Sequence, residues 1–413
     1  MTGGSGGVDQ ATRMLEAVPD PDVADADAPS SVREQIRERR AAQALNRSDR
    51  RTIFLVVPVI MLLIVGLGAM LSAASVVSFR ETGDSLFYIK RQVVWVGLGI
   101  VALVVFTRVP YRLYRRFALP IFLLAVAGLV ATMLFGDVRG GARRWIEVGP
   151  LLTIQASEFA KVATVIVLSA VLAKKDRLLG SLGHFLLPVA AILSVVSFLL
   201  LLQPDFGTAL LIVAAAFAIL FSSAAPVGFV VGLAGIAAVL GTAGAFAMDY
   251  RRERITGFLD PFADPLGTGH QAVQSLVALG TGGWFGVGLG ASRARWSFLP
   301  NAHTDFIFAI IGEETGLLGA GLVIVLFAFF AGVGIRIALT APDMFGRLLA
   351  VGIVAWLSFQ ALINVGGVVA VLPITGVPLP FVSSGGNAMI VSLAAVGILV
   401  NISRTRAPDP ASS

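Results

Sequence analysis

From residue 53 onward the chain is a series of long apolar runs separated by short polar breaks. Ten runs can be delimited, at 53–74, 91–109, 117–135, 154–173, 185–202, 206–224, 227–247, 306–334, 347–372 and 386–402. Most contain the roughly 20 residues that a helix needs to cross a bilayer. The pattern therefore predicts an all-α polytopic membrane protein with about ten transmembrane helices.

Composition supports a membrane location. Of the 413 residues, 56% are apolar and 14% are charged, and the mean hydropathy is +0.87. Soluble domains carry about a quarter charged residues, so this chain has too few charges to cover a soluble surface. It has no cysteine, and its three histidines (His184, His270 and His303) are far apart in sequence, which disfavours thiolate and histidine metal sites. The net charge of +6 bears on topology rather than on nucleic-acid binding.

The first 51 residues differ from the rest. They hold nine of the 25 acidic and eight of the 31 basic residues, with many Gly, Pro, Ser and Ala between them. Such a segment cannot bury a core, and it predicts a cytoplasmic, largely disordered tail. We expect residues 52–403 to form the membrane domain and residues 404–413 to form a second cytoplasmic tail.

Lys and Arg residues near the ends of the runs predict the orientation. With the N-terminus inside, the inner segments hold 18 of these residues and the outer segments hold 11. Cytoplasmic loops carry the excess of Lys and Arg, so both termini are predicted to be cytoplasmic. The longest connection, residues 248–305 between the seventh and eighth runs, then lies on the extracytoplasmic side.

This long outer loop contains the strongest catalytic candidate. Loops of such length in a compact fold are usually functional. Asp305 ends the loop, directly before the eighth apolar run, as a carboxylate with no evident partner in sequence. The alternative is that Asp305 only caps the following helix. Further polar candidates in the loop are Arg251, Arg252, Arg295 and His303.

Charged side chains at membrane depth are costly, so each is expected to be paired or functional. Glu158 and Lys161 stand three residues apart on one helix face, where they belong to a site or simply neutralise each other. Asp205 follows a proline and is a candidate helix cap as well as a site residue. The other candidates, each with an interfacial or packing alternative, are Arg143, Arg144, Trp145 and Glu313.

The connection after residue 372 contains three prolines among apolar residues. Proline excludes a regular helix there, while the apolar residues keep the segment at membrane depth. Non-helical backbone at that depth is tolerated only where protein buries it or where it lines a wet cavity. We therefore expect this segment to be buried or to line a cavity.

Six short motifs connect these candidates to a known family. They are Arg143-Arg144-Trp145-Ile146, Ser157-Glu158-Phe159-Ala160-Lys161, Gln203-Pro204-Asp205-Phe206-Gly207-Thr208, Ala302-His303-Thr304-Asp305-Phe306-Ile307-Phe308, Gly312-Glu313-Glu314 and Pro378-Leu379-Pro380-Phe381-Val382-Ser383. With these motifs, residues 52–404 resemble the SEDS family (shape, elongation, division and sporulation), and most closely its cell-division members. The resemblance implies ten transmembrane helices, cytoplasmic termini and a large outer loop between helices seven and eight.

The resemblance also implies an activity in the bacterial plasma membrane at the division septum. It is the polymerisation of lipid II into peptidoglycan glycan strands by an inverting glycosyltransferase, with undecaprenyl pyrophosphate as the leaving group. The implied partners are a class B penicillin-binding protein, which is a transpeptidase, and other membrane proteins of the division machinery. The family's essential aspartate corresponds to Asp305, and one carboxylate at the outer surface can act as the general base.

Cations are needed opposite the pyrophosphate, where negative charge grows during the reaction. The candidates for binding it are Arg143, Arg144, Lys161, Arg251 and Arg295. The supporting candidates are Glu158, Asp205, Trp145, His303 and Glu313. In this interpretation Glu158 and Asp205 orient Lys161 or bind a divalent cation, and no other cofactor is expected.

Three other functions remain open at this point. A lipid II flippase would need polar groups through the whole membrane depth, whereas here they gather toward the outer end. A non-catalytic scaffold of the division machinery would not require Asp305 or the cations. Within the enzyme class, an elongation polymerase of the same family is the alternative to the division enzyme.

Overall fold

The computed structural model describes residues 30–139, 142–148, 152–174, 182–223, 225–246, 249–293 and 304–405. The chain divides into two units, residues 1–50 and residues 51–413. Within the first unit the described residues are helical and belong to α3 (Ser30–Thr82). The remainder of the predicted N-terminal tail, and most of the predicted C-terminal tail, lie outside the described residues. The second unit contains all the apolar runs.

A helix lies at each of the ten predicted apolar runs. Besides α3, these helices are α4 (Phe87–Arg108), α6 (Ala118–Phe135), α7 (Ala156–Lys174), α8 (Leu182–Leu202), α9 (Phe206–Ser222), α10 (Val227–Phe246), α13 (Ile307–Leu339), α14 (Met344–Val368) and α15 (Gly386–Arg404). Seven of the described helices are long and apolar enough to cross a membrane, and the apolar parts of α8, α9 and α10 are shorter. The prediction of a helical multi-pass membrane protein is confirmed, while the number of ten spans stays a prediction.

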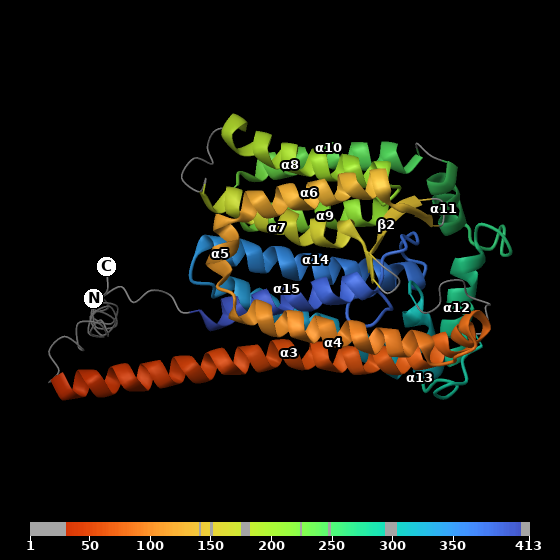
Figure 1. Ribbon diagram of the computed structural model, residues 1–413, viewed down its shortest axis with the longest axis horizontal. Coiled ribbons are helices and arrows are strands. Elements are labelled where there is room, and N and C mark those ends of the chain that lie inside the picture. Colours follow the sequence, from red (N-terminus) through yellow and green to blue (C-terminus); the bar gives the residue numbers. More distant parts are fainter. Residues whose placement is uncertain are drawn as a thin grey trace, which may run out of the picture. The chain divides into compact units, whose positions relative to one another are not determined.

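The remaining elements gather at the two ends of the helical bundle (Figure 1). At one end lies α5 (Tyr111–Arg116). At the other end lie α11 (Asp249–Leu259), α12 (His270–Gly282) and three short strands, β1 (Asp137–Arg139), β2 (Ala142–Val148) and β3 (Leu152–Ile154). The strands form an antiparallel sheet in the order β1-β2-β3. The sequence analysis expected no strands here, because runs of three to seven residues are too short for a clear alternating pattern.

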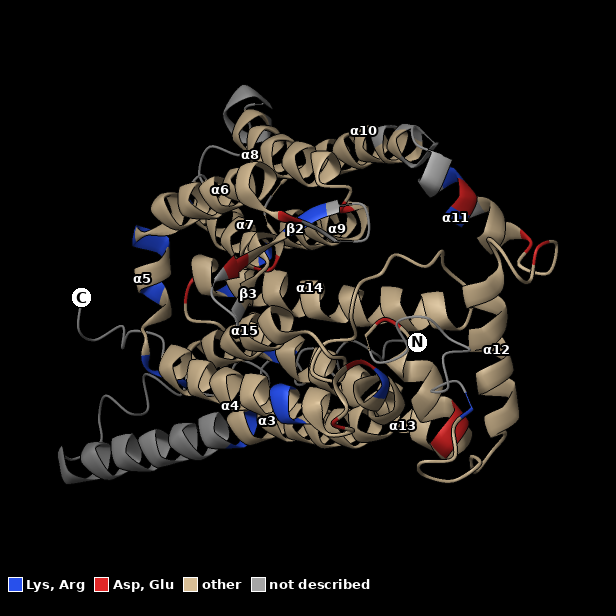
Figure 2. Cartoon of the chain, turned by 45° about the vertical axis from the view of Figure 1, so that its right-hand side comes forward, with Lys and Arg blue, Asp and Glu red and all other residues tan. Residues whose placement is uncertain are grey.

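Helices α7, α14 and α15 form the interior of the bundle. Most of their surface is buried: α15 packs on α4, α7 on α6, and α14 on α9 and α13. Helices such as α6 instead leave large apolar side chains exposed, for example Leu124 and Phe135. Figure 2 shows that most of the helical surface carries no charged residue. This arrangement suits a bilayer, in which apolar side chains can face lipid and every helix satisfies its own backbone groups.

The proline-containing segment between α14 and α15 is not helical, as predicted. Protein covers much of it, because Val377, Leu379, Phe381 and Val382 are all buried. Two interior side chains of α14 hold the segment in place. Gln360 donates through Nε2 to the carbonyl of Pro378 (2.9 Å), and Asn364, one turn later, donates through Nδ2 to the carbonyl of Val377, the preceding residue (2.8 Å). The expectation of irregular but buried backbone is therefore confirmed.

Candidate active site

Asp305 lines a cavity at the end of the bundle that contains α11 and α12. The other walls of this cavity are α14, around Asn364 and Gly367, and residues 374–377 of the proline-containing segment. Asp305 is half-buried, so its carboxylate is shielded but still reachable. The helix that follows has Phe306 at its capping position, with no side-chain capping hydrogen bond. The structure therefore gives no support to the alternative that Asp305 serves as a helix cap.

Opposing influences act on the charge of Asp305. Loss of water contact raises the pKa of this carboxyl to about 6, although a hydrogen bond with Thr304 and the guanidinium groups of Arg254 and Arg144 favour the charged form. A carboxylate with this pKa is mostly ionised at neutral pH, yet it binds a proton more readily than an ordinary aspartate. A group balanced in this way is suited to act as a general base.

Two arginines reach the surroundings of Asp305 from different elements. Arg254 comes from α11, and its Nη1 donates to the carbonyl of Ile374 (2.8 Å). A Cβ atom at Gly376 would lie 3.6 Å from Oδ2 of Asp305 and 3.9 Å from Nη1 of Arg254, so both groups face the same point. Arg144 comes from β2 and donates through Nε to the carbonyl of Gln203 (3.1 Å). Backbone carbonyls thus hold both guanidinium groups in position.

Arg254 was missed by the sequence analysis, which selected Arg251 from the same basic run. The two positions are three residues apart, so a helical pattern over this run would have placed them on one face. Arg251 belongs to α11, but its side chain lies outside what the structure describes, and Arg252 is exposed. Arg295 and His303, the other loop candidates, also lie outside the described residues.

The sequence analysis also missed Asn364, which connects the backbone of Asp305 to the segment that lines the cavity. Its Nδ2 atom donates to the backbone carbonyls of Asp305 and Val377, at 2.8 Å each. Its Oδ1 atom is buried and accepts no hydrogen bond in the described part of the chain. Asn364 lies inside an apolar helix, and nothing in its local sequence shows that it touches residue 305.

Lys161 and Glu158 form an ion pair inside the bundle, 2.8 Å from Nζ to Oε1. Their side chains are only 1% and 3% exposed. Lys161 also donates to Oε1 of Gln360 (3.1 Å) and lies over the ring of Trp356, at 5.1 Å from its centroid. Neither residue of the pair is among those that line the Asp305 cavity. The structure thus supports the alternative that the two charges neutralise each other.

The other candidates have structural contacts. Asp205 caps α9, accepting from the backbone N–H of Thr208 (3.3 Å), as its alternative interpretation predicted. Glu313 accepts from the hydroxyl of Ser292 and from the backbone N–H of Arg293, and so joins α13 to the preceding loop. Arg143 is exposed on β2, whereas Trp145 lines a second cavity.

The described part of the chain contains no evident acidic cluster that could bind a divalent cation. No group of three or more His, Cys, Asp or Glu residues there lies close enough to hold a metal ion. Glu158 and Asp205, the two carboxylates considered for such a role, are engaged by Lys161 and by the start of α9.

Comparison with known proteins identifies the family. The family of cell cycle proteins that includes FtsW, RodA and SpoVE matches residues 52–407. The chain belongs to the SEDS family. Its curated relatives include stage V sporulation protein E of Bacillus subtilis, which is 38% identical over 85% of this chain and 96% of the relative. Another is a probable peptidoglycan glycosyltransferase FtsW of Geobacter metallireducens, 37% identical over 87% of this chain and 96% of the relative.

Solved structures resemble this SEDS protein along most of its length. One, described as structural coordination of polymerization and crosslinking by a peptidoglycan synthase complex, has a TM-score of 0.71 and 28% identity, covering 85% of this chain and 96% of the other. The rod shape determining protein RodA of Thermus thermophilus has a TM-score of 0.64 and 27% identity, covering 86% and 98%. Likeness over nearly all of the membrane domain confirms both the family and its helical fold.

Proposed function

We propose that this SEDS protein is a peptidoglycan glycosyltransferase that polymerises lipid II. The observation that carries the proposal is the half-buried Asp305 in its cavity, with a pKa near 6 and with Arg254 and Arg144 beside it. The name of the Geobacter relative supports the same activity. A scaffold without catalysis would not need a carboxylate tuned in this way.

In the proposed reaction, the 4-hydroxyl of one amino-sugar attacks the anomeric carbon of another that is linked to undecaprenyl pyrophosphate. Asp305 takes the hydroxyl proton as the new carbon–oxygen bond forms. The bond from the anomeric carbon to the pyrophosphate breaks, the configuration inverts, and the electron pair leaves with the pyrophosphate. Arg254 and Arg144 are the cations that act on the charge of the base, and we assign to them the stabilisation of the growing negative charge.

The same proposal places the Asp305 end of the bundle on the extracytoplasmic side. The excess of Lys and Arg in the segments at the opposite end supports this orientation, with both termini in the cytoplasm. Apolar side chains on the outer helices would give the polyprenyl tail of lipid II a lipid-facing surface to follow. A soluble enzyme would have no such surface.

We further propose a septal role in cell division, together with a class B penicillin-binding protein and other membrane proteins of the division machinery. The FtsW relatives support the division role, although sporulation and elongation proteins are also among the similar chains. The resemblance to a peptidoglycan synthase complex that coordinates polymerization and crosslinking supports a transpeptidase partner.

The decisive experiment is a lipid II polymerisation assay on the purified full-length protein, with and without a class B partner. We expect glycan strands from the parent protein and none from Asp305→Asn. Equal strand formation by both proteins would remove Asp305 from the role of base. A parallel assay with fluorescent lipid II in vesicles tests the flippase alternative, which predicts translocation without strand formation.

A further inference from the structure

A second cavity, of about 180 Å³, lies at the same end of the bundle as Asp305. This is below the range of about 300–1,000 Å³ that is usual for sites enclosing a whole small molecule, so the cavity can hold one part of a larger ligand. The start of α4, the β2–β3 region and the turn before α15 provide its walls. The lining residues are Tyr88, Arg91, Gln92, Trp95, Trp145, Thr153, Ser384, Gly385, Gly386 and Asn387. None of these residues lines the Asp305 cavity.

The two cavities are lined by neighbouring parts of the chain. Residues 374–377 of the segment between α14 and α15 line the Asp305 cavity, while the end of that segment and the start of α15, residues 384–387, line the second one. On β2, Arg144 acts on the charge of Asp305, whereas its neighbour Trp145 lines the second cavity. Successive side chains of a strand point to opposite faces, so Arg144 and Trp145 lie on opposite faces of β2. A ligand that contacts both the base and the second cavity would pass this strand.

The second cavity combines aromatic rings with oriented amides. Trp95 is 7% exposed and packs against Gly386, where an added Cβ would meet ring atoms at 2.4–2.8 Å. Gln92 donates through Nε2 to the carbonyl of Ser383 (3.3 Å), and Asn387 donates through Nδ2 to the carbonyl of Thr153 (2.6 Å). These bonds fix both amide groups at the cavity wall. Aromatic faces attract the C–H face of a pyranose ring, while amides can bind its hydroxyl and acylamino groups.

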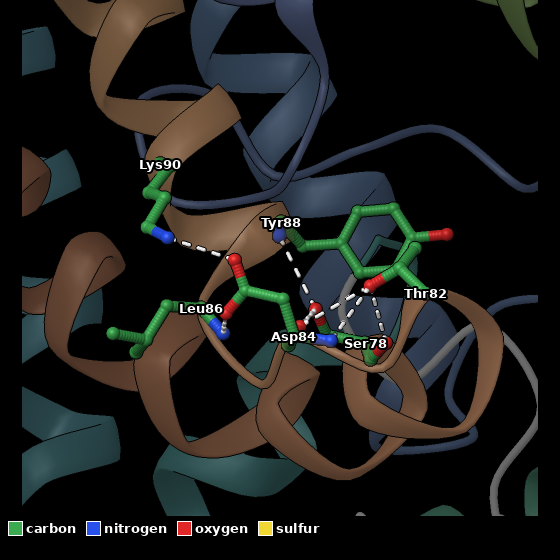
Figure 3. A network of polar contacts seen from close by, with 6 residues as sticks. All are labelled: Ser78, Thr82, Asp84, Leu86, Tyr88 and Lys90. Atoms are coloured by element: carbon green, nitrogen blue, oxygen red, sulfur yellow. Dashed lines mark hydrogen bonds and ion pairs between the residues drawn. The ribbon is translucent and has the colours of Figure 1, made fainter.

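One cation completes the cavity. Arg91 is exposed, and no described acidic side chain forms an ion pair with it. The turn that leads into α4 is held firmly, as Figure 3 shows. Asp84 accepts from the backbone N–H of Leu86 (2.9 Å) and pairs with Lys90 (2.7 Å), while the hydroxyl of Ser78 donates to its carbonyl (2.5 Å). Arg91 is therefore presented from a fixed helix start, available to an anionic group.

We propose that the second cavity is a subsite for the growing glycan strand, in which a saccharide unit that is not reacting binds against Trp145 and Trp95. Arg91 faces an anionic group carried by that unit. The inference rests on the proposed polymerase function and extends it from making single bonds to retaining the product. A strand held beside the base stays in place for the next addition, so the subsite sets how many units are added before release.

The first test measures strand length. Trp145→Ala and Arg91→Ala are compared with the parent protein and with two matched controls, Trp284→Ala in an exposed loop position and Arg108→Ala at the far end of α4. Losing one such contact accelerates strand release about tenfold, so we expect strands about threefold to tenfold shorter. The initial rate of lipid II consumption should change much less. Both controls should keep the parent strand length.

The second test does not depend on turnover. Soluble peptidoglycan fragments of a few disaccharides, carrying a photoreactive acyl group, are crosslinked to the Asp305→Asn protein. We expect labelled peptides from residues 88–95 and 384–387, and weaker labelling when Trp145→Ala or Arg91→Ala is added. Parent-like strand length together with parent-like labelling in both variants overturns the subsite. If the parent protein forms no glycan at all, the polymerase function fails instead, and the labelling pattern alone decides whether the cavity binds saccharide.

Discussion

Two of the carboxylates that stood out in this apolar chain, Glu158 and Asp305, have different environments. Glu158 is almost fully buried and pairs with Lys161, which is itself fixed by Gln360 and Trp356. Asp305 is half-buried beside a cavity, and two arginines act on it without neutralising the effect of burial. The charge of Glu158 is paired inside the protein, although its Oε2 atom accepts no hydrogen bond in the described part of the chain, whereas Asp305 remains free to exchange a proton.

This difference indicates that Glu158 bears on the stability of the protein and Asp305 on its chemistry. In a buried ion pair the two charges compensate each other, and removing one member leaves the other charge unpaired. A carboxylate whose pKa is raised toward neutrality lies in an environment that does not favour its charge. It therefore accepts a proton readily and contributes little to folding. Substitutions at the two sites should therefore affect different measurements.

The largest expected effect is the loss of activity in Asp305→Asn. The amide has nearly the same shape but cannot accept the hydroxyl proton, and loss of a general base lowers rates about 10²- to 10⁴-fold. The measurement is lipid II polymerisation per folded molecule, with the thermal unfolding midpoint as the control. We expect the midpoint to stay within a few degrees of the parent value. A large drop in the midpoint would make Asp305 a structural residue like Glu158.

Lys161→Met should have the opposite signature. It leaves Glu158 buried without its cation, and breaking a buried pair in this way costs about 3–5 kcal/mol. We expect a lower unfolding midpoint and a lower yield of monodisperse protein, while the activity of the remaining folded molecules changes little.

The matched control for this substitution adds Glu158→Gln, so that both charges are absent together. Replacing a buried pair as a whole is often nearly neutral, and much of the lost stability should return. If Lys161→Met instead abolishes polymerisation at normal stability, the interior pair contributes to the chemistry and the contrast with Asp305 fails.

How much of this contrast could be predicted from sequence depends on the range of the interactions. Each of the ten apolar runs became a helix, because length and hydropathy are local properties. The irregular segment after α14 was also predictable from its prolines. Asp305 was found because it directly precedes an apolar run, and Asp205 because a proline marks the helix start that it caps.

The rest of the site depends on contacts between residues far apart in sequence. Asn364 binds the carbonyl of residue 305 from a helix 59 residues further on, and Arg254 binds Ile374 across 120 residues. Lys161 was selected as a cation for the substrate, and its second partner, Gln360 on α14, could not be foreseen because it is 199 residues away. The local sequence pattern does not reveal such pairings. The three strands were missed for a different reason, since runs of three to seven residues are too short to show a clear alternation.

The pH dependence of the reaction sharpens the comparison further. Asp305 must be ionised to accept a proton, so polymerisation should fall on the acid side with a midpoint near pH 6. The guanidinium of Arg254 lowers the pKa of Asp305, so Arg254→Gln should raise that pKa and move the acid limb to higher pH. Because Arg254 also stabilises the leaving pyrophosphate in the proposed reaction, the variant should be slower at every pH. The loss relative to the parent should be smallest at pH 8 and should grow as the pH falls through 6.

Arg252→Gln is the matched control for this shift, since Arg252 is an exposed residue of the same helix. It removes the same charge from the protein without removing the contact at Ile374. We expect the acid limb of this variant to coincide with that of the parent. Equal shifts in both variants would mean that net charge, and not the position of Arg254, sets the protonation of Asp305.

The smallest expected effect concerns Asp205. Like Asp305, it stands directly before an apolar run in the sequence, but like Glu158 it has a structural role. Asp205→Ala removes the cap of α9 and should cost about 1 kcal/mol, which a small drop in the unfolding midpoint would report. Asparagine is an equally good cap, so Asp205→Asn should restore the midpoint. Both variants should polymerise lipid II at the parent rate per folded molecule. If the asparagine variant is stable but inactive, the charge of Asp205 is used, and a cation bound by this carboxylate becomes part of the site.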